Sequence, residues 1–294
     1  MAWQRLKLDA ERRVADALGE ILMDLGALSV SVMDAAAGTA REEPIFGEPG
    51  ETARLWEACT LSALFALDAD VEEALAASAR IAGLAAAPAH AVERLEDQDW
   101  VARTQELLAP VHASPRVWVV HSWHVPPDPA AVNVLVDPGT AFGTGGHATT
   151  RLCLAWLDEH VRGGETVLDW GTGSGILAIA ALKLGAARAI GVDVDEEALR
   201  VAAANAQAND VAIDLHGARD APVVEADLVV ANILASPLKA LAPLLARAVR
   251  PGGALALSGI LVDQAAEVAA AYPDFAFDPP RAEEGWVLLG GRRG

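Results

Sequence analysis

Residues 167–178 read Val-Leu-Asp-Trp-Gly-Thr-Gly-Ser-Gly-Ile-Leu-Ala, and this stretch decides the fold. The apolar residues around Asp169 predict a buried strand, the glycines predict a tight turn, and the apolar residues after Gly175 begin a helix. Glycine suits positions Gly171 and Gly173 because such a turn needs positive φ and lets a flat ligand approach backbone amides at the helix N-terminus. The spacing is G-x-G-x-G instead of the G-x-G-x-x-G of dinucleotide-binding proteins, and a turn with a purely structural role remains an alternative.

The residues on both sides of this turn predict an alternation of strands and helices. The expected strands are Thr166–Trp170, Ala189–Val192, Asp227–Ala231 and Ala254–Leu257. The expected helices are Ser174–Leu184, Glu196–Ala208, Pro237–Val249 and Asp263–Ala271. Near-continuous apolar strands between amphipathic helices are typical of a mostly parallel, doubly wound sheet that helices cover on both faces. We therefore expect an α/β domain that binds its ligands at the carboxyl ends of the strands.

The N-terminal part shows a second, shorter alternation. Strands are expected at Trp3–Leu8, Ala27–Met33, Thr60–Ala66 and Val92–Asp97, and helices at Ala10–Leu25 and Val71–Leu84. Two successive β-α-β units suggest a small α+β domain with a split βαβ (ferredoxin-like) arrangement. Three prolines within residues 124–131 bar a helix and interrupt a sheet, so we expect a linker there. The predicted organisation is a first domain at 1–97, a linker region at 98–131 and a second domain at 132–294.

The charge and cysteine content disfavour several classes of protein. The 294 residues include 22 Lys and Arg against 41 Asp and Glu, for a net charge of −19, and 53% of them are apolar. This composition predicts a globular chain, and its acidic field disfavours binding to nucleic acid or to an anionic membrane. The field would attract a basic protein partner, although an acidic surface can simply maintain solubility. Two distant cysteines, together with the lack of an apolar leader or a long uncharged segment, predict a cytoplasmic protein.

Two polar residues stand at the ends of predicted strands. Asp193 follows the second strand about 20 residues after the glycines, where a carboxylate can accept hydrogen bonds from two ribose hydroxyls. The alternative for Asp193 is a helix N-cap, a role that Asp195 could fill instead. Asn232 ends the strand that begins at Asp227, and its amide offers both donors and an acceptor. The alternative for Asn232 is a turn or cap residue.

A glycine-rich segment precedes the first strand of the second domain. Residues 136–152 read Val-Asp-Pro-Gly-Thr-Ala-Phe-Gly-Thr-Gly-Gly-His-Ala-Thr-Thr-Arg-Leu. We expect a polar loop that leads into an apolar helix and can close over a ligand, although a surface loop without function is the alternative. Its side chains of interest are Phe142, Thr144, His147, Thr149 and Thr150.

These segments together resemble the class I S-adenosylmethionine-dependent methyltransferases. The glycine-rich loop, Ala231-Asn-Ile-Leu and Leu257-Ser-Gly-Ile-Leu are more specific, and are similar to the bacterial methyltransferases that modify large-subunit ribosomal protein eleven. The resemblance covers most of residues 90–290 and extends more loosely to the N-terminal part. It departs from the family pattern at Gly146 and Ala148, where threonine and proline are usual, and at Thr172, where cysteine is common.

The resemblance implies a Rossmann-like catalytic domain and a small N-terminal domain that grips the ribosomal protein. The family trimethylates lysine side chains and the N-terminal amine, with S-adenosylmethionine as methyl donor. By position, the resemblance assigns cofactor binding to Thr150, Gly171, Asp193 and Asn232, and we expect Gly173, Thr144 and His147 at the same site. We expect a monomer that binds its protein substrate without direct contact to nucleic acid or membrane.

The substrates suggest a mechanism and its alternatives. An amine must be neutral to attack a methyl group, so we expect Asn232 to orient it and Phe142 to exclude water. His147 as a general base is a less favoured alternative. We expect no metal, because His121 and His124 have a helical spacing but precede a proline-rich segment. Competing hypotheses are a methyltransferase of the same lineage with another protein substrate, a non-catalytic cofactor-binding scaffold, and a nicotinamide dehydrogenase.

Overall fold

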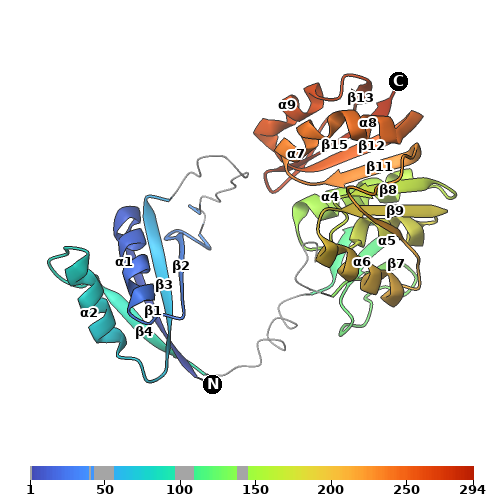
Figure 1. Ribbon diagram of the computed structural model, residues 1–294. Coiled ribbons are helices and arrows are strands. Elements are labelled where there is room, and N and C mark those ends of the chain that lie inside the picture. The colour runs from blue at the N-terminus through green and yellow to red at the C-terminus, as the bar shows by residue number, and fades with distance from the viewer. Residues whose placement is uncertain (1, 40, 43–55, 97–108, 138–144) are drawn as a thin grey trace. The chain divides into compact units, whose positions relative to one another are not determined.

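The chain divides into two compact units, Met1–Arg103 and Thr104–Gly294. The structure is a computed structural model, shown in Figure 1, and it describes residues 2–39, 41–42, 56–96, 109–137 and 145–294. Two of the residues singled out in the sequence, Phe142 and Thr144, lie outside the described residues.

The first unit contains one antiparallel sheet and two helices. Its elements follow one another as β1 (Trp3–Glu11), α1 (Arg12–Asp24), β2 (Ser29–Asp34), β3 (Ala58–Ala66), α2 (Val71–Ile81) and β4 (His90–Leu95). The strand order is β2-β3-β1-β4. Apolar residues of the sheet, such as Leu6, Leu61 and Phe65, share a buried core with Leu18 of α1 and Leu75 of α2. The chain order is therefore β-α-β-β-α-β around one core.

The second unit is built on an eight-stranded mixed sheet. Its strands are β8 (Thr166–Trp170), β9 (Arg188–Asp193), β10 (Asp214–Gly217), β11 (Ala226–Asn232), β12 (Val249–Leu261), β13 (Phe275–Phe277), β14 (Arg281–Glu283) and β15 (Trp286–Arg293). The order is β10-β9-β8-β11-β12-β15-β13, with β14 paired to β15. The first five strands of this order are parallel, and β15 runs antiparallel to β12. The predicted α/β class with a mostly parallel sheet is confirmed.

Helices cover both faces of this sheet (Figure 1). One face carries α4 (Ala148–His160), α5 (Ile176–Leu184) and α6 (Glu196–Ala208), and the other carries α7 (Ala235–Ala240), α8 (Ala242–Ala248) and α9 (Ala265–Ala270). Alternate strand residues enter opposite cores: Val167 packs with α4 and α5, and its neighbour Leu168 packs with α7 and α8. Burial on both faces explains why the strand sequences are apolar without alternation.

The segment predicted as a linker contains ordered strands. Strands β5 (Val111–Ser114), β6 (Val117–Val120) and β7 (Val132–Leu135) form a three-stranded sheet, and β6 and β7 are parallel. The prolines of residues 124–131 lie in the connection between β6 and β7, within the second unit. The second unit therefore begins before residue 132, the boundary expected from the sequence. The short valine-rich strands β5 and β6 belong to it because they pair with each other and with β7.

Two predicted helices are interrupted in the structure. The helix expected at Pro237–Val249 is divided into α7 and α8 at Leu241. Pro243 has no amide hydrogen to donate to the preceding turn, so the helix restarts there. The helix expected at Asp263–Ala271 begins as a 3-10 turn, Val262–Gln264, before α9. Among the described residues, no helix combines the length and the apolarity needed to cross a bilayer.

Candidate functional site

Three strand ends meet at the centre of the large sheet. Trp170, the last residue of β8, is paired with Val192 of β9 on one side and with Ala231 of β11 on the other. The residues that follow these three in the chain therefore lie side by side at the carboxyl ends of the strands. They are Gly171, Asp193 and Asn232. The chain leaves β8 toward β9 and later returns on the other side at β11, which makes this position the topological switch point where open α/β sheets bind ligands.

The glycine turn after β8 has the backbone conformation that its sequence predicts. Gly171, Gly173 and Gly175 have φ values of +76°, +52° and +79°, all in the left-handed region. A Cβ atom on Gly171 would lie 2.4 Å from Cγ2 of Ile233, which follows β11. The turn is therefore held against the end of the neighbouring strand, and glycine at position 171 is required by both conformation and space.

Replacing Gly171 by alanine is expected to lower the free energy of unfolding by about 2–3 kcal/mol. The left-handed conformation costs a non-glycine residue about 1–2 kcal/mol, and the new methyl group must also displace a stiff β-branched side chain. Urea unfolding measures the change. The matched control is Gly164→Ala, whose φ is +94° but whose Cβ would have open space. An equal loss in both variants would contradict the proposed contact with Ile233.

The Asp193 carboxylate is fixed between the glycine turn and the start of α6. Its Oδ2 accepts a hydrogen bond from the Gly173 amide at 2.8 Å, and its Oδ1 accepts one from the Asp195 amide at 3.1 Å. The N-cap of α6 is Asp195, whose side chain accepts from the Glu197 amide. Asp195 thus fills the capping role, as the sequence allowed, and the half-buried Asp193 is left to face the strand ends.

Asn232 does not cap the helix that follows it. Helix α7 begins at Ala235 with Leu234 as its N-cap and has no side-chain cap. The backbone after Asn232 is held by a different contact, because the Ile233 amide donates to the carbonyl of Ser258 in β12. Asn232 is half-buried at the carboxyl end of β11. The capping alternative for this residue is therefore removed.

Asp169 is a buried carboxylate that contacts the glycine turn, and it is not among the site residues predicted from the sequence. Its Oδ2 accepts hydrogen bonds from the Thr172 hydroxyl at 2.7 Å and the Ala178 amide at 3.3 Å. Its Oδ1 is buried without a hydrogen-bond partner among the described residues. Burial raises the pKa of Asp169 to about 7. The available signal was a single charged residue inside an otherwise apolar strand.

The raised pKa makes stability depend on pH with a definite sign. Because Asp169 binds its proton more tightly when folded than when unfolded, its protonated form stabilises the protein at low pH. That contribution is lost as the pH rises from about 4 through about 7. We expect the stability of Asp169→Asn, relative to wild type, to increase by about 3 kcal/mol as the pH rises from 5 to 8, because the wild-type carboxyl loses about 1.4 kcal/mol per pH unit up to its pKa. Urea unfolding at both pH values measures this change. A difference between the two proteins that is independent of pH would contradict the shift.

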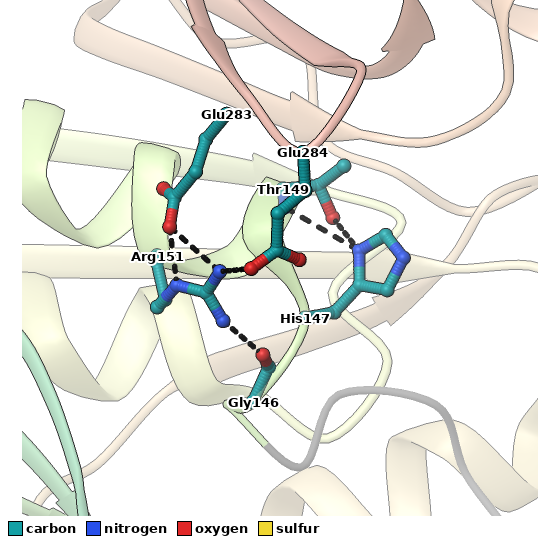
Figure 2. Close-up of polar contacts among 6 residues, drawn as sticks. All are labelled: Gly146, His147, Thr149, Arg151, Glu283 and Glu284. Carbon is teal, nitrogen blue, oxygen red and sulfur yellow. Dashed lines mark hydrogen bonds and ion pairs between the residues drawn. The ribbon is translucent and has the colours of Figure 1, made fainter. Parts of the chain in front are cut away.

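His147 stands immediately before the first residue of α4 (Figure 2), and Thr150 lies in the first turn of that helix. His147 is the N-cap, and its Nδ1 accepts from the Thr149 amide at 3.3 Å and lies 2.8 Å from the Thr149 hydroxyl. The His147 ring packs edge-on against Trp286, with centroids 5.0 Å apart. Burial, and then the charge of Arg151, lower the pKa of His147. Because Nδ1 accepts the cap hydrogen bond and the ring packs against Trp286, the side chain has a structural role at the start of α4.

Helix α4 brings Thr150 toward the same region of the sheet. Thr150 is buried, and its amide donates to the His147 carbonyl at 3.0 Å. Cys153 lies three residues later on the same face of the helix. Burial beside Asp169 raises the pKa of the Cys153 thiol, which also contacts the Ser258 hydroxyl. Cys153 of α4 thus lies near Asp169 of β8 and Ser258 of β12.

His121 has a packing role within the second unit. It is buried, its Nδ1 lies 2.5 Å from the Val136 carbonyl oxygen, and its ring stacks on Trp123 with centroids 4.8 Å apart. These contacts occupy one ring nitrogen and one ring face.

Known proteins match the chain over its whole length. The family model described as ribosomal protein L11 methyltransferase (PrmA) matches residues 2–294. The chain belongs to this family. The relative from Chromobacterium violaceum is 51% identical over 295 residues, which cover 100% of this chain and 99% of the relative. The relative from Thiobacillus denitrificans is 52% identical over 293 residues, 99% of each chain, and both are called ribosomal protein L11 methyltransferase.

A solved structure of the family agrees with the catalytic fold. The ribosomal protein L11 methylase from Lactobacillus delbrueckii subsp. bulgaricus is 33% identical to this chain, with a TM-score of 0.57. The matched region covers 63% of this chain and 98% of that one. The family resemblance predicted from the glycine loop and the strand ends, and the Rossmann-like fold it implied, are therefore confirmed.

Proposed function

We propose that this protein transfers methyl groups from S-adenosylmethionine to lysine side chains and to the N-terminal amine of ribosomal protein L11, the large-subunit protein eleven. The main support for this proposal is that Gly171, Asp193 and Asn232 lie together at the topological switch point of the sheet, and that the chain belongs to this family. S-adenosylmethionine is the cofactor, and the reaction is a protein methylation.

The residues at the strand ends fit this cofactor. S-adenosylmethionine supplies a sulfonium-bound methyl group that a neutral amine can take. Its ribose hydroxyls are donors, and the Asp193 carboxylate is an acceptor that the Gly173 amide already orients. The left-handed glycines keep side chains away from the backbone of the turn, so that Gly171 and Gly173 present main-chain groups to the ligand. Thr150, His147 and Thr144 complete the set of residues that we assign to cofactor binding.

In this proposal the enzyme accelerates methyl transfer by binding the neutral form of the substrate amine and by orienting it. A free lysine has a pKa of about 10.4, and a desolvated position beside a cation lowers it, because both effects disfavour the ammonium form. The amide oxygen of Asn232 accepts a hydrogen bond from the amine and aims its lone pair at the methyl carbon, while Phe142 excludes water. When bound, S-adenosylmethionine would supply the methyl group to the amine nitrogen and leave as S-adenosylhomocysteine, and the proton of the methylated amine would pass to solvent. The rate gain comes from proximity and orientation.

The charge of the chain supports a basic protein as substrate. A net charge of −19 attracts a cationic ribosomal protein and repels RNA, so we propose that L11 is methylated before it joins the ribosome. We assign recognition of L11 to the N-terminal unit, and we propose that the enzyme acts as a monomer in the cytoplasm, without direct binding to nucleic acid or membrane.

Intact-mass spectrometry of purified L11 tests the proposal. L11 incubated with the enzyme and S-adenosylmethionine is expected to gain mass in steps of one methyl group, and to gain little or none with the Asp193→Ala variant. If the enzyme binds the cofactor but leaves L11 unchanged, the substrate is another basic protein. If it binds no cofactor, the methyltransferase proposal is overturned.

A further inference from the structure

Arg151 links two segments that lie far apart in the sequence (Figure 2). It is the fourth residue of α4, and only 18% of its side chain is exposed. Its Nε donates to Glu283 Oε1 at 2.8 Å, and its Nη2 donates to Glu284 Oε1 at 2.8 Å. Its Nη1 donates to the Gly146 carbonyl oxygen. All three nitrogens of the guanidinium group are therefore used.

The partners of Arg151 belong to the β14–β15 hairpin. Glu283 ends β14, and Glu284 lies in the turn with a left-handed φ of +51°, a conformation that costs energy in a non-glycine residue. Trp286 begins β15 and packs against the His147 ring. The hairpin thus contacts the start of α4 at two points, through the guanidinium group and through the aromatic pair.

A second ion pair also joins α4 to β14, and it serves as a comparison for Arg151. Arg281 of β14 pairs with Glu159 near the other end of α4, at 2.6 and 2.8 Å. Both side chains of that pair are about half exposed, at 41% and 51%, and it contacts no backbone group of the helix start. Arg151 differs because it also binds the carbonyl of Gly146, the residue immediately before the N-cap His147.

We propose that Arg151 is a positioning residue for the cofactor, which holds Gly146 and His147 so that His147 and Thr150 face the methyl donor. The inference rests on the proposed function, in which these two residues lie at the cofactor site. Glu283 and Glu284 orient the guanidinium group from the hairpin side. Arginine is suited to this task, because its planar donors bind two carboxylates and a carbonyl oxygen at fixed angles. Lysine offers a single point of charge.

The first test is calorimetric binding of S-adenosylhomocysteine to the full-length protein. We expect Arg151→Gln to weaken binding about tenfold, the double variant Glu283→Gln/Glu284→Gln to weaken it similarly, and the triple variant to be no weaker than either, because all three residues act as one unit. The matched control, Arg281→Gln, is expected to bind within twofold of wild type. If Arg151→Gln does not fold, the double variant, whose carboxylates are more exposed, carries the same test.

The second test is an NMR titration of His147, identified by the signal lost in His147→Gln. The charged groups that face this ring are Arg151 of α4 and Glu284 of the hairpin turn, and they act on its pKa in opposite directions. We expect Arg151→Gln to raise the pKa of His147, Glu284→Gln to lower it, and Arg281→Gln to leave it unchanged. If these shifts are absent, Arg151 and Glu284 do not lie beside the His147 ring, and the positioning role that depends on this placement is overturned.

The outcomes separate the two proposals. Wild-type affinity in both Arg151→Gln and the double variant, with only a lower melting temperature, would overturn the positioning role and leave the methyltransferase proposal intact. Failure of the wild-type protein to bind S-adenosylhomocysteine would overturn the proposed function, and the inference with it.

Discussion

Replacing Asp193 by alanine is expected to weaken S-adenosylhomocysteine binding about 100-fold. In our proposal the carboxylate accepts hydrogen bonds from two ribose hydroxyls, and a hydrogen bond to a charged group contributes about 1.5–3 kcal/mol. The variant also frees the Gly173 amide, which Asp193 Oδ2 now binds at 2.8 Å. A loss of about 3 kcal/mol corresponds to about 100-fold in affinity. Isothermal titration calorimetry on the full-length protein measures it.

Asp195→Ala is the matched control, because it removes a carboxylate two residues away. Asp195 caps α6 through the Glu197 amide, so its loss should cost about 1 kcal/mol of stability. The affinity should stay within twofold of wild type. If both variants lose affinity equally, the effect comes from the start of α6, and the ribose role of Asp193 is wrong.

Replacing Asn232 by alanine is expected to lower kcat about 100-fold at saturating cofactor and L11. The alanine variant keeps the strand end, because the neighbouring Ile233 amide still donates to the Ser258 carbonyl. What it loses is the amide that orients the amine, and a small misplacement of reacting groups can cost about 100-fold in rate. Methyl transfer to L11 is measured by mass spectrometry under multiple-turnover conditions.

Asn133→Ala provides the comparison for Asn232→Ala. Asn133 lies in β7, and its Nδ2 donates to the carbonyls of Asp128 and Ala131, away from the end of β11. We expect this variant to retain wild-type kcat even if it is less stable. Unchanged turnover in Asn232→Ala at saturating substrates would remove Asn232 from the mechanism.

Local patterns were sufficient wherever an element carries its own start and stop signals. Strand β8 was predicted with its observed bounds, because an apolar run ends at Gly171, where the left-handed backbone ends the strand. Helix α6 was also predicted with its observed bounds, because Asp195 caps its first turn. The helix expected at Pro237–Val249 is present, but its division at Leu241 was not predicted, because the apolar pattern continues without a break across Pro243.

Strands that depend on distant partners were not predictable in the same way. The run at β15 spans eight residues and contains two adjacent glycines, and it becomes an interior strand of the sheet only because β12 and β13 flank it. Similarly, β5 and β6 gain their hydrogen bonds from each other and from β7, across a proline-rich connection. Their strand conformation depends on backbone pairing, which no local periodicity encodes.

The α/β class, the glycine turn, the family and the residues at the strand ends could all be predicted from the amino-acid sequence, because each depends on local backbone conformation or on a short motif. Only the tertiary structure decided that Asp169 is buried with a raised pKa and that Arg151 meets Glu283 and Glu284 across 132 and 133 residues. A pKa depends on the solvent and charges that the fold places around a group. An ion pair depends on which distant segments the fold brings together, so both follow from packing and not from spacing along the chain.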